Sequence, residues 1–164
     1  DFARMPKPIL KINNLIDLLN ENIKLLSEVD KSIKIDFNKS SDKILFNCDR
    51  EQLNRVFFNL IKNSIESIQQ KSEKKPNLDK KISIEIMMNN DHINFIMTDT
   101  GIGFDQIKND IKKILNPYFT TKKDGTGLGL SIVNKIINDH NGELNFFSIP
   151  EGAKIEINFK INGN

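Results

Sequence analysis

Five of the eight glycines in this 164-residue chain lie in two short clusters about twenty residues apart. The first cluster, DTGIGF, holds Gly101 and Gly103, and the second, DGTGLGL, holds Gly125, Gly127 and Gly129. Clustered glycines let the backbone adopt positive φ angles and approach a ligand without an intervening Cβ. The second cluster also opens an amphipathic segment, and the free N–H groups of a helix N-terminus attract anions. Two such clusters flanking one loop predict a loop folded over an anionic ligand, of which a nucleotide is the best candidate.

An acidic residue, Asp99, ends the apolar run directly before the first glycine cluster. Ile93, Phe95 and Met97 alternate with other residues as in a strand, and continuing this period places Asp99 on their face. Because a carboxylate at the end of an apolar face is costly to bury alone, we expect it to have a partner. Considered alone, such a residue is more often part of a turn or cap, so its assignment to a site depends on its neighbours.

Two carboxamides, Asn59 and Asn63, lie one turn apart in a segment with the periodicity of a long helix, roughly residues 50–70. At about 100° per residue they share a polar face with Gln52 and Glu66, opposite an apolar stripe. Asparagine accounts for 22 of the 164 residues, so this pair alone would usually belong to a solvated face. A site is favoured by the conjunction of the carboxamides, the carboxylate and the two glycine clusters in one order along the chain.

The remaining apolar periodicities predict the elements that position these residues. They predict helices over about residues 9–28, 50–70 with Asp49 as its N-cap, 107–115 and from 127 to a stop at Gly142, strands near 33–37 and 43–47, and hairpins over 82–97 and 144–161. This order predicts a two-layer α/β sandwich, with three helices on one face of a mixed, mostly antiparallel five-stranded sheet.

Length and composition restrict the class of protein. At 164 residues and 38% apolar content the chain can form one sizeable core, preceded by a proline-containing connector at residues 1–8. A net charge of +2 without a basic block argues against nucleic-acid binding. The single cysteine, Cys48, excludes an internal disulfide and fits a reducing compartment. Since no run approaches the roughly 18–20 apolar residues that cross a bilayer, we expect a soluble, cytoplasmic domain.

Four ordered motifs resemble the N, G1, F and G2 boxes of sensor histidine kinase catalytic domains. They are NRVFFNLIKNSIESI, DTGIGF, NPYFTT and GTGLGLSIV. The resemblance covers about residues 9–161 and implies the Bergerat-type ATP-binding fold that these kinases share, more distantly, with gyrase, Hsp90 and MutL. The opening DFARMPKP is similar to the junction after the dimerisation helices of NtrY-type nitrogen-regulation sensors. The resemblance therefore implies a connector at residues 1–8 and a catalytic ATP-binding domain at residues 9–164.

The resemblance also implies roles for polar side chains in binding ATP. Asp99 would accept a hydrogen bond from the exocyclic amine of adenine, since a carboxylate is purely an acceptor. Asn63 would offer its amide oxygen to Mg²⁺, a hard ion that prefers oxygen ligands, and Asn59 would support that metal site. Lys122 would supply positive charge to the phosphates. Asn59, Asn63 and Lys122 are thus the implied catalytic residues.

The same resemblance implies that the two glycine clusters contact the nucleotide through their backbones. The residues implied in these contacts are Gly101, Gly103, Thr126, Gly127, Leu128 and Gly129. Phe119 would be a hydrophobic anchor of a mobile lid, at about residues 104–126, that closes over ATP.

The implied activity is transfer of the γ-phosphoryl group of ATP to a histidine in a two-component system. ATP-hydrolysing relatives typically carry a water-activating glutamate where the resemblance places Asn59, and an amide cannot take that proton. Neither His92 nor His140 lies in a His-Glu or His-Asp acceptor context, so we expect both to be structural. The resemblance therefore implies that the acceptor is on the dimerisation domain of a homodimeric full-length kinase, which would serve a response regulator.

Two alternatives stay open at the level of sequence. One is a degenerate module that binds or senses a nucleotide without phosphotransfer, because Glu66 stands where many relatives carry a basic residue. The other is an ATPase of the gyrase and Hsp90 type, against which Asn59 argues. Anchoring of the parent protein in the inner membrane also stays open.

Overall fold

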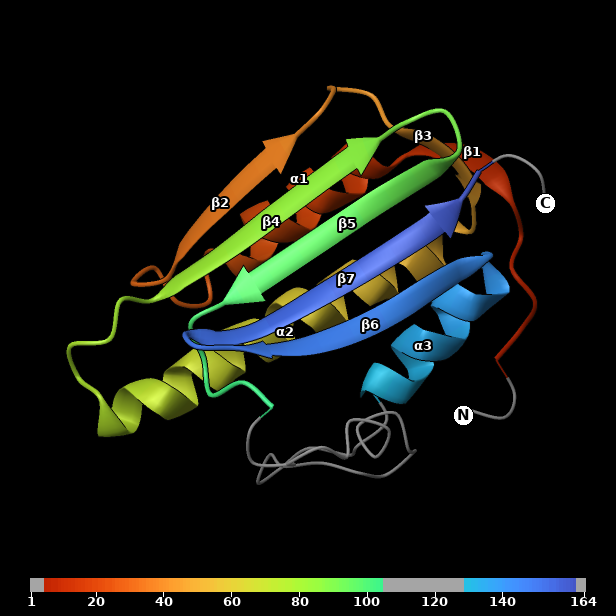
Figure 1. The fold of residues 1–164 in the computed structure, drawn as a ribbon. Helices are drawn as coiled ribbons and strands as arrows, with labels where there is room; N and C mark the ends of the chain where they lie inside the picture. The colour runs from red at the N-terminus through yellow and green to blue at the C-terminus, as the bar shows by residue number, and fades with distance from the viewer. Residues whose placement is uncertain (1–4, 105–128, 162–164) are drawn as a thin grey trace.

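In the computed structural model, which describes residues 5–104 and 129–161, three helices cover one face of a five-stranded sheet (Figure 1). The elements in chain order are β1 (Lys11–Asn14), α1 (Leu15–Leu26), β2 (Lys34–Lys39), β3 (Leu45–Cys48), α2 (Arg50–Lys74), β4 (Lys81–Met88), β5 (His92–Asp99), α3 (Gly129–Asp139), β6 (Gly142–Ile149) and β7 (Gly152–Lys160). The helix expected at residues 107–115 lies outside the described residues.

The five-stranded sheet has the order β2-β4-β5-β7-β6. β2 is parallel to β4, and the other neighbouring strands are antiparallel. The predicted fold class, three helices on one face of a mixed, mostly antiparallel sheet, is confirmed. β5 is the central strand, and its last residue, Asp99, lies between Ile82 of β4 and Ala153 of β7.

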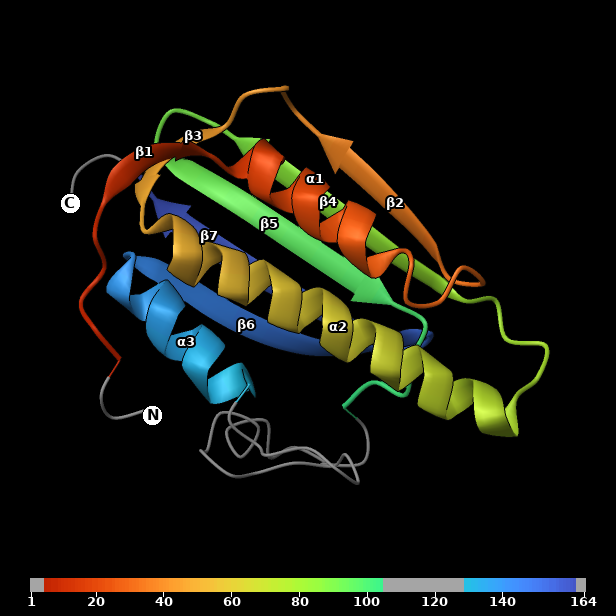
Figure 2. The same cartoon turned by 180° about the vertical axis from the view of Figure 1, so that it is seen from behind.

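The core lies between the sheet and the helices, which Figure 2 shows from the helical side with α2 between α1 and α3. Alternate residues of β4, β5 and β7 are buried on this face, as the period of two in the sequence predicts. Phe57 of α2 packs on Phe95 of β5 with 5.4 Å between the ring centroids. Since burying one such side chain contributes roughly 1.5–3 kcal/mol, this packing fixes α2 over the centre of the sheet.

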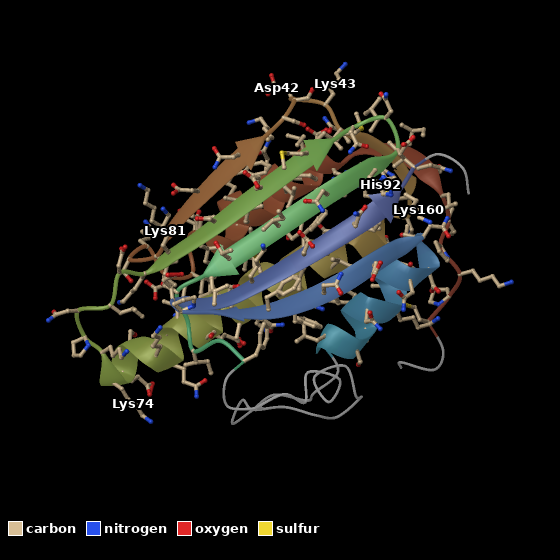
Figure 3. The ribbon with its side chains drawn as sticks, in the orientation of Figure 1. Asp42, Lys43, Lys74, Lys81, His92 and Lys160 are labelled. Carbon is tan, nitrogen blue, oxygen red and sulfur yellow. The ribbon has the colours of Figure 1, made fainter. Side chains whose placement is uncertain are left out.

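The opposite face of the sheet carries the polar half of the same alternation and is turned toward the viewer in Figure 3. Lys81 on β4, His92 on β5 and Lys160 on β7 alternate onto this face, next to buried neighbours on the other. No described helix covers it. Among the described residues, the sheet therefore buries only one of its two faces.

The predicted helix over residues 9–28 is wrong in its first turns. Residues Lys11–Asn14 form β1, which pairs antiparallel with β3, and α1 starts at Leu15. Asn14 is the N-cap, and its side-chain oxygen accepts hydrogen bonds from the N–H groups of Ile16 (3.1 Å) and Ile44 (2.9 Å). Ile12 fitted the helical spacing, but it is 65% exposed on β1. Asparagine is a favoured N-cap residue, so Asn14 could have marked the start of α1. The helical spacing of the residues before it pointed to an earlier start.

The predicted stop of the last helix at Gly142 is also wrong. α3 ends at Asp139, and the residue with positive φ is Asn141 (61°), which tolerates this conformation better than most residues. Gly142 instead begins β6, where a Cβ would lie 2.7 Å from Ile137 and from Phe159.

α2 has the predicted N-cap, since the Asp49 side chain accepts a hydrogen bond from the N–H of Gln52 at 3.0 Å. With 25 residues it extends to Lys74, beyond the predicted end. Gln52, expected on the polar face, is buried and donates its amide N–H to the Pro6 carbonyl at 3.0 Å. Among the described residues, no helix combines the length and apolar character needed to span a membrane.

Candidate functional site

Asp99 is a buried carboxylate at the end of the central strand, with only 6% of the residue exposed. Its Oδ2 accepts a hydrogen bond from the Ser64 hydroxyl of α2 at 2.6 Å, and its Oδ1 accepts one from the N–H of Gly101 at 2.9 Å. The sequence predicted that this carboxylate must have a partner. That partner is Ser64, which the sequence analysis did not identify.

Burial raises the pKa of Asp99 above its usual value, because the interior disfavours the charged form. Hydrogen bonds from Ser64, Gly101 and Ala153 and the positive charge of Lys71 oppose that rise. A carboxylate offers roughly four acceptor positions, so these three donors leave capacity for a donor from a ligand. Asp99 is therefore a buried acceptor whose orientation is fixed by hydrogen bonds from the protein itself.

The turn that follows Asp99 requires glycine because other backbone segments approach it closely. A Cβ on Gly101 would overlap the Ser67 hydroxyl of α2, and Gly103 has a φ of +72°. A Cβ on Gly103 would lie 2.7 Å from the carbonyl oxygen of Gly152, the first residue of β7, where the turn from β6 closes. The N–H of Ile102 donates to the Ser67 hydroxyl at 2.8 Å. Residues 99–103, hereafter the glycine turn, are thus enclosed by α2 and the β6–β7 turn.

The two carboxamides lie on α2, beside the residues that hold Asp99. Asn63 directly precedes Ser64, Asn59 lies one turn earlier, and both are partly exposed. At about 100° per residue they continue the helix sector that carries Ser64 and Ser67. The structure therefore brings the carboxamides and the glycine turn to one side of the same helix.

Glu66 is compensated within α2. Its carboxylate lies 3.9 Å from the Lys62 ammonium, one turn earlier, and both side chains are substantially exposed. A pair of this kind contributes little to stability, but it offsets the negative charge that Glu66 brings near the carboxamides.

Part of the predicted site lies outside the described residues. This part comprises Phe119, Lys122, Thr126, Gly127 and Leu128. Gly129 is the first described residue of α3, and a Cβ there would meet no atom of the described residues within 4 Å. Phe104, at the start of the expected lid, packs edge-on against Phe146 of β6 with 5.4 Å between ring centroids.

Sequence reasoning missed four residues of this region: Ser64, Ser67, Lys71 and Gly152. The first three follow a helical spacing of three and four residues on α2, which is a detectable signal once the helix is assigned. Gly152 was seen only as part of a hairpin turn. Its contact with the glycine turn joins residues about fifty positions apart, which no local pattern reveals.

Over residues 48–163 the chain matches the family described as histidine kinase-, DNA gyrase B-, and HSP90-like ATPase. It is 34% identical over 161 residues to an NtrY-like sensor histidine kinase of Rickettsia conorii, covering 98% of this chain and 26% of that protein. It is 34% identical over 149 residues to the signal transduction histidine-protein kinase AtoS of Escherichia coli, covering 88% of this chain and 23% of AtoS. The chain therefore spans about a quarter of the length of these relatives.

Solved structures show the same fold. The nucleotide-free catalytic domain of histidine kinase ThkA superposes with a TM-score of 0.78 at 27% identity, covering 93% of this chain and 96% of that chain. The mycobacterial sensor histidine kinase MprB shares the fold with a TM-score of 0.77 at 16% identity, covering 93% of this chain and 97% of that chain.

Proposed function

Because the chain belongs to the family of histidine kinase-, DNA gyrase B-, and HSP90-like ATPases, we propose that it is the ATP-binding catalytic domain of a two-component sensor histidine kinase. It transfers the γ-phosphoryl group of ATP to a histidine on a separate dimerisation domain. The observation that carries this proposal is Asp99, a buried carboxylate with acceptor capacity beside a glycine turn and two carboxamides.

Asp99 selects adenine in this proposal. A carboxylate can only accept hydrogen bonds, and the exocyclic amine of adenine is a donor. Guanine carries a carbonyl oxygen at the corresponding ring position, which would face the carboxylate as a second acceptor. Binding of ATP or ADP but not of GTP or GDP is therefore expected.

The phosphate end of the nucleotide lies, in this proposal, between α2 and the start of α3. Asn63 offers an amide oxygen to the metal and Asn59 supports it, and amide oxygens suit a hard cation. A Mg²⁺ ion held there would supply positive charge that offsets the charge of the phosphates. The backbone at residues 127–129 and the side chains of Lys122 and Thr126 contact the phosphates, while Phe119 anchors a lid at about residues 104–126.

The residue types in the site support phosphoryl transfer over hydrolysis in this proposal. The carboxamide of Asn59 cannot activate water as a general base. The acceptor histidine lies on a dimerisation domain joined through residues 1–8 to the catalytic domain at 9–164, and the full-length kinase is a homodimer that serves a response regulator. The names of the relatives support this assignment, since both are sensor or signal-transduction histidine kinases.

Calorimetric titration with ADP and Mg²⁺ tests nucleotide binding. For the unsubstituted chain we expect heat of binding with ADP and none with GDP. For Asp99→Asn we expect a much weaker heat with ADP. A folded parent chain that gives no heat with either ADP or ATP would contradict the proposal.

Phosphotransfer is tested by adding the dimerisation hairpin of the full-length protein in trans with γ-labelled ATP. We expect labelled histidine with the parent chain, loss of labelling with Asn63→Ala, and normal labelling with Asn138→Ala, an exposed asparagine near the end of α3. Nucleotide binding without labelled histidine would support a nucleotide-sensing module instead.

A further inference from the structure

Lys71 connects two turns that are about fifty residues apart in the sequence. It lies in the last turn of α2, and its ammonium donates hydrogen bonds to the carbonyl of Gly101 at 3.1 Å and the carbonyl of Glu151 at 2.9 Å. Figure 1 shows this region, where the end of β5, the β6–β7 turn and the C-terminal half of α2 come together. Both acceptors are backbone carbonyls, so Lys71 constrains the backbone conformation of the two turns.

The two turns also touch each other directly. A Cβ on Gly152 would overlap the carbonyl oxygen of Asp99 and lie 2.9 Å from the nitrogen of Gly101. Ser67 holds the glycine turn from the helix side through the N–H of Ile102. The glycine turn is therefore held by α2 and the β6–β7 turn, and the Lys71 side chain bonds to both turns.

Lys71 also contributes positive charge at Asp99, where it lowers the pKa that burial raises. The charged groups on adjoining strands are directed elsewhere. Lys81 of β4 alternates onto the open face and lies 3.3 Å from the Asp36 carboxylate, and Lys154 of β7 lies over the ring of Phe147. Glu151, in the β6–β7 turn, is exposed and takes part through its backbone carbonyl.

On the premise that the chain binds ATP as proposed above, we propose that Lys71 is a positioning residue for the nucleotide. By bonding to the carbonyls of Gly101 and Glu151, it fixes the glycine turn against the β6–β7 turn and so keeps the Asp99 carboxylate in its accepting geometry. It does not touch the ligand in this proposal. It acts through the turn whose N–H at Gly101 bonds to Asp99.

The variants that test this role are Lys71→Met, which removes the charge and the donors, and Lys71→Arg, which keeps both. Lys74→Met is the matched control, since Lys74 is an exposed lysine one turn further along α2 (Figure 3). In the nucleotide-free protein, Lys71→Met is expected to raise the pKa of Asp99, read from its carboxyl carbon by NMR, and to speed hydrogen exchange at Gly101 and Ile102. Affinity for ADP with Mg²⁺ should fall about tenfold, since charge-assisted hydrogen bonds are lost.

Lys71→Arg should restore the carboxyl titration, the slow exchange and most of the affinity, whereas Lys74→Met should match the parent in all three. A Lys71→Met protein that titrates, exchanges and binds like Lys74→Met would overturn the proposal. The nucleotide-free readouts separate this proposal from the previous one. If the parent does not bind ADP, the proposed function fails, while the titration and exchange still decide whether Lys71 positions the turn. If Lys71→Met melts well below the control, Lys71→Gln supplies the same comparison.

Discussion

At the scale of single residues, Asp99 is an ionisable group placed where the fold alone would favour an apolar residue. Ile93, Phe95 and Met97 precede it on the same buried face of β5. Burial of a carboxylate is costly, and donors from Ser64 and Gly101 offset part of that cost. The presence of a carboxylate at this buried position is best explained by a ligand that it binds.

The first prediction follows from this conflict between stability and binding. Asp99→Asn replaces the charge by a neutral group of similar shape, whose oxygen can accept from Gly101 and whose NH₂ can donate to Ser64. We expect affinity for ADP to fall about 10- to 100-fold, because a hydrogen bond to a charged acceptor is lost. At neutral pH the melting temperature should stay the same or rise, because the desolvation cost is gone. A variant that melts lower and binds ADP like the parent would contradict this account.

The difference in stability between the parent protein and Asp99→Asn should depend on pH with a defined sign. Burial raises the pKa of Asp99 in the folded state above its unfolded value, so protonation favours folding. This contribution to stability is present below the unfolded pKa and is lost as pH rises through the folded pKa. Any stability advantage of Asp99→Asn at neutral pH should therefore shrink as the pH falls through the pKa of Asp99. Thermal melts of the parent protein and of Asp99→Asn across acidic pH measure this change in the stability difference.

Ser64 gives a second prediction at this scale. Ser64→Ala removes the hydroxyl that donates to Asp99 at 2.6 Å, so the pKa of Asp99 should rise and ADP affinity should fall about tenfold. Ser72→Ala is the control, because the Ser72 hydroxyl donates only to the local Gln69 carbonyl on the same helix. The acidic limb of ADP binding, measured by calorimetry, should move to higher pH for Ser64→Ala alone. Identical limbs for the two variants would remove Ser64 from the site.

At the scale of elements, the glycine turn depends on close approach of the β6–β7 turn. Gly152→Ala would push a Cβ into the Asp99 carbonyl oxygen, and we expect it to destabilise the protein by about 1–3 kcal/mol. Gly129→Ala is the control, because a Cβ there meets no atom within 4 Å among residues 5–104 and 129–161 and alanine favours a helix. Denaturant unfolding of the two variants measures the difference. Equal stabilities would show that the two turns are not packed as described.

The start of α1 gives another prediction for an element. Asn14→Ala removes the N-cap and the acceptor for Ile44, so we expect a loss of about 1–2 kcal/mol. Asn20→Ala, at an exposed position within α1, should change stability little or raise it. If the helix began near residue 9 as its periodicity predicts, the two substitutions would have similar effects. Chemical denaturation distinguishes these outcomes.

The fold was largely predictable because most elements bury one face with a regular period. Alternation in β4, β5 and β7 and the apolar stripe of α2 each have a single interpretation. β1 was not predictable in the same way, because exposed isoleucines such as Ile12 extended the helical spacing of α1 by chance. The sequence analysis assigned the stop of the last helix to Gly142, although the residue there with positive φ is Asn141. Position 142 requires glycine for another reason, because a Cβ would collide with Phe159.

The candidate site was predictable only in part, for a related reason. Asp99 and the glycines were found because each departs from the pattern around it. Ser64 and Lys71 follow the polar pattern of an ordinary helix, and their partners become visible only when β5 and the β6–β7 turn are placed beside α2. Contacts of this kind depend on the tertiary structure.

At the scale of the whole molecule, one imidazole joins the ends of two helices. Buried His140, just after α3, accepts a hydrogen bond at Nε2 from the N–H of Asp49 at 3.1 Å, and its Nδ1 lies 2.7 Å from the Ile136 carbonyl. Asp49 in turn accepts from the N–H of Ile9 at 2.8 Å. These bonds agree with the structural role expected for His140. They fix the end of the molecule away from the glycine turn, where the N-terminal segment joins the helical layer (Figure 2).

Binding of the nucleotide beside Asp99 is tested by mapping where ADP binds on the whole domain. Addition of ADP with Mg²⁺ to isotope-labelled protein should shift the NMR signals of the glycine turn, of Asn63 and Ser64, and of the start of α3, and should move the carboxyl carbon of Asp99. Signals from the open face of the sheet, such as those of Glu85 and Asn94, should stay in place. Shifts confined to that open face, with Asp99 unmoved, would contradict the account.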